Sequence, residues 1–238
     1  MGGIDHNPTS NASKKFTVPA ERALSQALAS FFAGNAVVED AIMTDEALSY
    51  GAGRGHLGLA VTNFEAASGQ LGVCSSYVKQ LIGVMSVGDY EPFEPTTSLD
   101  LDAFYAELVA AGLVPDAKAA RDIIEVLREG SYTAVFRRYL EMIESLQDSL
   151  EVLSGLTAEM RDHEGLQGLF WASVEANRRP FRQAFAFALT KFNEVLTAWH
   201  VTALISTETY LKGTKAPGLM SNAGEVAIVE RNTVVTTA

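Results

Sequence analysis

The stretch LGLAVTNFEAASGQLGVCSSYVKQLIGVM, residues 57–85, has the most regular apolar pattern in the chain. Large apolar side chains recur at intervals of seven, which predicts one long helix with a coiled-coil-like seam. The neighbouring positions on this face are small, such as Ala60 and Ala67, so a second helix can approach closely. The residues of the seam are Leu57, Phe64, Leu71, Val78 and Met85.

Two other segments repeat this rhythm, with apolar residues in alternating steps of four and three. One begins after Ser131 and ends at Gly155, and the other begins at Pro180 and ends at Gly213. Three helices of roughly 24 to 32 residues predict an all-α fold, an elongated antiparallel helical bundle. The two repeats consist of Tyr132, Phe136, Tyr139, Ile143, Leu146, Leu150 and Leu153, and of Phe185, Leu189, Phe192, Leu196, Trp199 and Ala203.

The rest of the chain is divided by prolines, glycines and polar runs. Residues 1–16 are predicted to be a polar N-terminal arm, and residues 17–213 the helical bundle, with a sub-boundary at 88–98. Within the bundle we expect a helix from Thr17 to Gly34 and a second one over 37–50. After the loop at 88–98 we expect a short helical hairpin, whose helices end at Gly112 and Gly130, before the long helix that follows Ser131.

The last segment, residues 214–238, departs from the helical pattern. It contains EVAIVERNTVVTTA, which is rich in β-branched residues and therefore prone to form strands. A two-stranded hairpin alone is marginal in water, so the tail is either disordered or completes its hydrogen bonds on another chain by strand addition. The predicted oligomer contacts are Val226, Ile228, Val234 and Val235.

Composition excludes several classes of function. The net charge of -11 argues against general nucleic-acid binding, because phosphate contacts need clustered Lys and Arg. The chain contains no uninterrupted run of 18 apolar residues, so we expect no membrane-spanning helix. One cysteine, Cys74, and the lack of an apolar signal segment indicate a location in the cytoplasm, or within a particle assembled there.

Candidate chemistry is sparse. Gly53-x-Gly55-x-x-Gly58 has the spacing of a dinucleotide fingerprint, but it lacks a preceding strand and an acidic residue about 20 positions later. We therefore expect a turn between helices. Glu159 and His163 lie four residues apart, but no second copy of this pair exists for a di-metal site, and we predict no metal, no cofactor and no catalytic residue.

Aromatic residues on the third long helix are the candidates for a small-molecule site. Phe185, Phe192 and Trp199 lie on one face and are predicted either to pack in the core or to contact an apolar ligand or a partner helix. His200 follows Trp199 and is expected to be a structural histidine on the flank of the bundle.

The start of the chain offers one resemblance. Ile4 to Asn7, IDHN, resembles the Ile-Gly-His-Asn tag with which many otherwise unrelated proteins of alphaproteobacteria and their phages begin, with Asp5 in place of the glycine. The resemblance covers four residues. It implies a phage or alphaproteobacterial origin and assigns no activity.

These observations predict a non-enzymatic structural or assembly protein. We expect it to form a homo-oligomer, or to contact other subunits of a particle, through its helical seams and terminal arms. The alternative is a helical-bundle regulator that binds a small ligand or a partner helix. A third hypothesis, a membrane-active protein that extrudes residues 57–87, is disfavoured because Glu65 and Lys79 lie within that segment.

Overall fold

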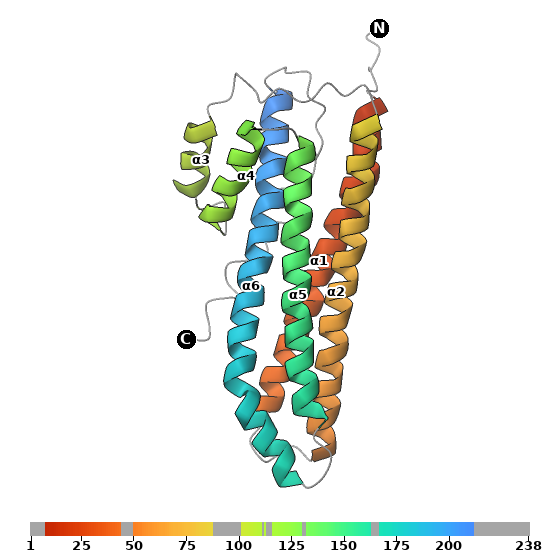
Figure 1. The fold of residues 1–238 in the computed structure, drawn as a ribbon, viewed down its shortest axis with the longest axis vertical. Helices are drawn as coiled ribbons and strands as arrows, with labels where there is room; N and C mark the ends of the chain where they lie inside the picture. Colours follow the sequence, from red (N-terminus) through yellow and green to blue (C-terminus); the bar gives the residue numbers. More distant parts are fainter. Residues whose placement is uncertain are drawn as a thin grey trace. The chain divides into compact units, whose positions relative to one another are not determined.

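The computed structural model describes residues 8–43, 50–87, 101–110, 112, 116–129, 132–162 and 167–211. These residues form six helices and no strand, which confirms the all-α class (Figure 1). The predicted loop at 88–98, residues 1–7 of the predicted polar start and the tail from residue 212 lie outside the described part of the chain. The helices are α1 (Pro8–Met43), α2 (Tyr50–Val87), α3 (Leu101–Ala110), α4 (Ala117–Glu129), α5 (Tyr132–Arg161) and α6 (Gln167–Leu211).

The first two predicted helices are one helix. α1 begins at Pro8 rather than Thr17 and continues through Gly34, which we had expected to end a helix. Gly34 is buried, and a Cβ atom added there would lie 2.7 Å from the ring of Phe64. The glycine therefore lets the aromatic ring approach the backbone of α1 without interrupting the helix.

The glycine-rich segment before Leu57 is helical as well, so the prediction of a turn at Gly53, Gly55 and Gly58 is wrong. These residues lie in the first turns of α2. A Cβ atom at Gly53 would lie 3.2 Å from the ring of Phe170, so this glycine also allows a close aromatic contact. The predicted seam is confirmed where side chains are described, because Leu57, Phe64, Leu71 and Val78 are buried.

The predicted helical hairpin is confirmed: α3 and α4 lie side by side in Figure 1. Gly112 has a φ of 63°, a left-handed conformation that favours glycine, and its N–H donates to the carbonyl of Val109. Asp116 precedes α4, and its Oδ1 accepts hydrogen bonds from the backbone N–H groups of Lys118 and Ala119, both at 2.9 Å. These contacts cap the N-terminus of α4.

The predicted boundaries of the other two long helices are wrong at one end each. α5 continues past Gly155 to Arg161, and α6 begins at Gln167, so Pro180 lies inside it. A proline removes one backbone hydrogen bond from a helix. Here, buried side chains on both sides of it, Phe170 and Phe181, pack in the core and stabilise a continuous helix. The apolar repeat of α5 is buried as predicted, from Phe136 to Leu153.

The chain divides into two compact units that share the four long helices. Unit 1 comprises residues 1–22, 74–142 and 193–238, and unit 2 comprises 23–73 and 143–192. The division therefore runs through α1, α2, α5 and α6, and both described segments next to the predicted boundary at 88–98 belong to unit 1. Unit 1 also contains α3 and α4, and the N–H of Asp116 donates to Thr197 Oγ1 of α6.

Candidate functional site

The residues predicted as oligomer contacts, Val226, Ile228, Val234 and Val235, lie outside the described part of the chain, so that prediction stays untested. The three aromatic candidates are described, but they are divided between the two units. Phe185 and Phe192 belong to unit 2 and Trp199 to unit 1.

Phe185 and Phe192 belong to an aromatic cluster of unit 2. The ring of Phe31 in α1 stacks on Phe185, with centroids 4.7 Å apart and planes 8° from parallel, and it contacts Phe192 at the same distance. Phe64 and Phe181 extend the cluster, with centroids 6.2 Å apart. Since Phe192 is fully buried, a ligand at this position would have to displace a core ring. The prediction of a ligand contact stays untested, and the contacts described are internal.

Trp199 belongs to a buried polar cluster in unit 1. Its Nε1 donates a hydrogen bond to Glu21 Oε1 at 3.0 Å, and its ring lies 5.1 Å from that of Tyr139. The hydroxyl of Tyr139 is 3.7 Å from Cys74 Sγ, and either group can be the donor. The four residues of this cluster come from α1, α6, α5 and α2 and are 7% exposed or less.

Burial controls the protonation of this cluster. It raises the pKa of the Glu21 carboxyl, and the hydrogen bond from Trp199 opposes this rise only in part. It raises the pKa of the Cys74 thiol to about 12, and raises that of the Tyr139 phenol well above 10. Cys74 is therefore a neutral thiol at pH 7, as the sequence predicted for a buried cysteine, and lacks the thiolate character of a nucleophile.

Glu21 was not among the residues predicted from the sequence, although its position carries a signal. Thr17, Glu21, Leu24, Leu28 and Phe31 are spaced by four and three residues, so position 21 belongs to the apolar face of the helix. All five side chains are buried. An acidic residue at such a position predicts a hydrogen-bond partner from another helix, because an unpaired buried charge is strongly destabilising.

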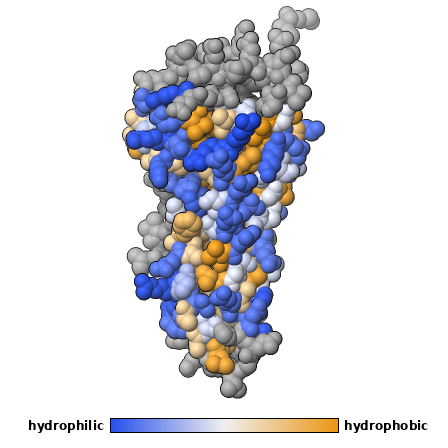
Figure 2. Space-filling view, in the orientation of Figure 1, coloured by the Kyte–Doolittle hydropathy of each residue, from blue (hydrophilic) through white to orange (hydrophobic). Residues whose placement is uncertain are grey.

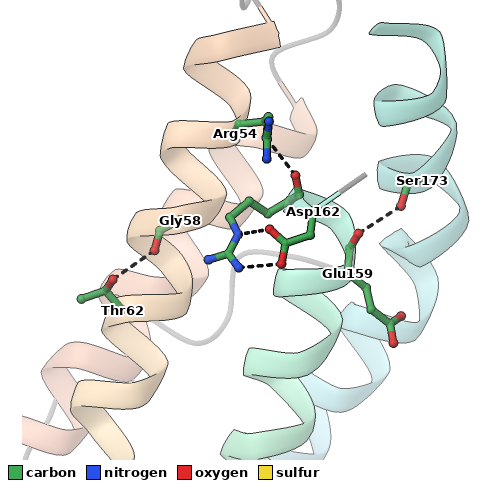
Figure 3. Close-up of polar contacts among 7 residues, drawn as sticks. Arg54, Gly58, Thr62, Glu159, Asp162 and Ser173 are labelled. Atoms are coloured by element: carbon green, nitrogen blue, oxygen red, sulfur yellow. Dashed lines mark hydrogen bonds and ion pairs between the residues drawn. The ribbon is translucent and has the colours of Figure 1, made fainter. Parts of the chain in front are cut away.

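A second polar cluster connects the helices of unit 2 where α5 ends (Figure 3). Arg54 Nε of α2 donates to the carbonyl oxygen of Arg161, the last residue of α5, at 3.1 Å. The Arg161 side chain makes a bidentate ion pair with Asp162, and Ser173 Oγ of α6 donates to the carbonyl of Glu159 at 3.5 Å. The hydrogen bonds from Arg54 and Ser173 supply donors to carbonyls near the helix end, which indicates a structural cap.

The exposed side of α2 in unit 2 includes one row without charged residues. Six exposed positions spaced by four and three residues carry no charge, although the surface side of a helix is normally charged. Two of them are large and apolar, since Leu59 is 52% exposed and Val73 is 43% exposed. We call this row the α2 outer face. It consists of Gly55, Leu59, Thr62, Ala66, Gly69 and Val73.

The glycines of this face have no packing role that the structure describes. A Cβ atom added at Gly55 or Gly69 would meet nothing within 4 Å, in contrast to Gly34. Each glycine inside a helix destabilises it by about 1 kcal/mol relative to alanine. The spacing that buries one side of α2 thus continues on the exposed side, with small residues in place of charged ones. From the sequence, Gly55 was predicted to lie in a turn between helices rather than on a helical surface.

The described residues contain neither a candidate metal site nor a candidate membrane span. Within the described ranges, no group of three His, Cys, Asp or Glu side chains has an arrangement that could hold a metal ion. His163, a candidate ligand in the sequence, lies outside those ranges. No helix among the described residues has the length and apolarity of a membrane span. On the face shown in Figure 2, apolar patches interrupt a hydrophilic surface.

Comparison with known proteins does not assign a family: no protein-family model, curated protein or solved structure matches the chain.

Proposed function

We propose that the protein is a non-enzymatic assembly subunit that forms a homo-oligomer through the α2 outer face. The observation that carries this proposal is the absence of charge from six exposed positions of that face, in a chain with net charge -11. The exposed side of α5 in the same unit carries Glu144, Asp148 and Glu151 at the corresponding spacing.

A helix pairing between two copies would account for this surface. Spacing by four and three residues is the pattern that keeps one row of a helix against a partner helix. Small residues in the row permit close approach of the two backbones, and Leu59 and Val73 would be removed from water. Dispersion and apolar burial would then offset the helix propensity lost at Gly55 and Gly69.

The role in a particle and the alternative function depend on other observations. A role in a phage or other particle assembled in the cytoplasm depends on the resemblance of Ile4 to Asn7 alone. The alternative function, a regulator that binds a ligand between the aromatic side chains, is less favoured. Phe192 and Trp199 are 0% and 3% exposed, so binding there would have to open a packed core.

Light scattering at several micromolar concentrations tests the proposal. We expect the wild-type protein to have the mass of a dimer or a larger species. Ala66→Glu places a charge in the α2 outer face, so we expect it to lower this mass. Ala33→Glu is the matched control, since Ala33 is an exposed alanine of α1 in the same unit. Circular dichroism checks that both variants are folded. A wild-type mass of one chain at all concentrations would contradict the proposal.

A further inference from the structure

A groove of about 420 Å³ lies between α2 and α5 in unit 2. Its floor includes the buried side chains of Val61, Phe64 and Leu150. Its wall on α5 is low, because a Cβ atom added at Gly155 would meet nothing within 4 Å. The remaining lining residues are Glu65, Ser68, Glu151, Ser154, Ala158 and Arg161.

The groove carries an acidic side chain on each wall. Glu65 lines it from α2 and Glu151 from α5, and Glu151 continues the exposed acidic row of Glu144 and Asp148. Among the described residues, these three α5 acids have no ion pair within 4 Å. Like charges three or four residues apart destabilise a helix slightly. Arg161, at the other end, already pairs with Asp162. The groove therefore favours an occupant that has both apolar and cationic side chains.

In the same unit, the side of α6 that carries Arg179 and Phe187, here called the outer face of α6, has these properties. Arg179 is exposed and has no ion pair within 4 Å in the described part of the chain, while Arg178 contacts Glu175 only at 3.6 Å. Phe187 is 57% exposed, and the Lys191 ammonium lies 5.5 Å from its ring. Arg182 differs from its neighbours, because it already binds Glu39 through two hydrogen bonds.

We propose that the outer face of α6 in one copy of the chain docks into the groove between α2 and α5 of a second copy. This inference rests on the proposed assembly function and adds a second contact to it. Arg179 would lie near Glu65 and Glu151, and Arg178, one residue earlier, would lie at the edge of the contact. Phe187 would lie over Ala158, one turn beyond Gly155.

The lengths of the two surfaces are compatible. Arg179 and Phe187 are about 12 Å apart along α6, and the groove extends about 16 Å along α5 from Leu150 to Arg161, at 1.5 Å per residue. The contact joins two different surfaces, so it is heterologous. It would build a ring if its rotation closes and an open chain if it does not.

Neutral substitutions on each side test the contact by sedimentation at low and high salt. Arg178→Gln with Arg179→Gln neutralises the α6 face, and Glu65→Gln with Glu151→Gln neutralises the groove. We expect each double variant to stop at a dimer, as the wild-type protein should at high salt, where rim charges are screened. Glu107→Gln with Glu125→Gln, on α3 and α4, is the control. It removes two negative charges, as the groove variant does, and should assemble like the wild type.

Mixing the two double variants gives the decisive result. Each supplies the surface that the other lacks, so an equimolar mixture should form groove contacts again and exceed the mass of either double variant at low salt. If the wild-type protein and both double variants have equal masses, the inference is wrong. This holds whether the groove then binds another protein or residues of its own chain. If these masses are all dimeric, the proposed function stands. If all are one chain, the proposed function fails as well. A mixture that stops at one copy of each variant would support the groove contact and contradict α2 pairing.

Discussion

Glu21 is a buried carboxyl in a position where the helical repeat predicts an apolar side chain. Burial disfavours its charged form and raises its pKa, while the hydrogen bond from Trp199 favours the charged form and opposes that rise. Burial is the larger effect. Folding therefore stabilises the protonated form of Glu21 relative to the ionised form, so ionisation of Glu21 weakens the fold.

The free energy of unfolding should depend on pH through Glu21. Because the folded state raises the pKa, the stability that protonated Glu21 provides is complete below the ordinary carboxyl pKa of about 4.5 and is lost as the pH rises through the folded value. Glu21→Gln keeps an oxygen acceptor for Trp199 and cannot ionise. We expect it to be more stable than the wild type at pH 8, by about 1.4 kcal/mol for each unit of pKa shift, and the gain to shrink towards pH 4.

Urea unfolding followed by tryptophan fluorescence measures this difference, with exposed Glu107→Gln as the control. A gain from Glu21→Gln that is the same at pH 4 and pH 8 would contradict the described environment of Glu21.

The sequence predicted that Cys74 and Trp199 lie on the apolar faces of their helices, but it did not predict which residues of other helices they contact. Cys74 was expected to be a buried, unreactive thiol, and it is buried. Trp199 was expected on an apolar face, and it is buried there. Its partner Glu21 is 178 positions away in the sequence. Periodicity describes one helix at a time, so a contact between two helices depends on their relative register, which one sequence does not contain.

At the scale of helices, the sequence predicted the apolar repeats well and the ends poorly. Gly34, Gly155 and Pro180 were each expected to limit a helix, and each lies inside one. Local propensity is worth about 1 kcal/mol for a glycine, whereas burying one large apolar side chain is worth about 1.5 to 3 kcal/mol. Tertiary packing therefore decides where these long helices end.

Glycines with different surroundings should respond in opposite ways to the same substitution. Gly34→Ala places a Cβ atom 2.7 Å from the buried ring of Phe64, and we expect it to destabilise the fold by about 1 to 3 kcal/mol. Gly69→Ala meets open space, so we expect stabilisation by about 0.5 to 1 kcal/mol.

Both changes are best measured by urea unfolding in the Ala66→Glu background, where α2 pairing is suppressed and the effect on folding is isolated. Two shifts of the same sign would contradict the packing described for these glycines.

For the whole molecule, the distribution of charge matters more than its sum. The net charge of -11 alone suggests a chain whose copies repel one another. In unit 2, however, α5 exposes an acidic row, α6 exposes arginines and α2 exposes an uncharged row. The sequence predicted self-association through the terminal arms and the apolar seams. The seam of α2 is buried within the chain, so the candidate surface is the opposite side of that helix, where the signal is missing charge.

Disulfide trapping tests the central claim, that α2 pairs with α2 of another copy, most directly. Cys74 is buried and has a pKa of about 12, so an added surface cysteine is the only reactive thiol of the folded chain. Single cysteines at Thr62, Ala66 and Gly69 sample the α2 outer face, and Ala33→Cys on α1 is the control. Under mild oxidation at micromolar concentration, we expect at least one of the three to form a disulfide-linked dimer and the control to remain one chain. No dimer from any of the three, or as much from the control, would contradict pairing through α2.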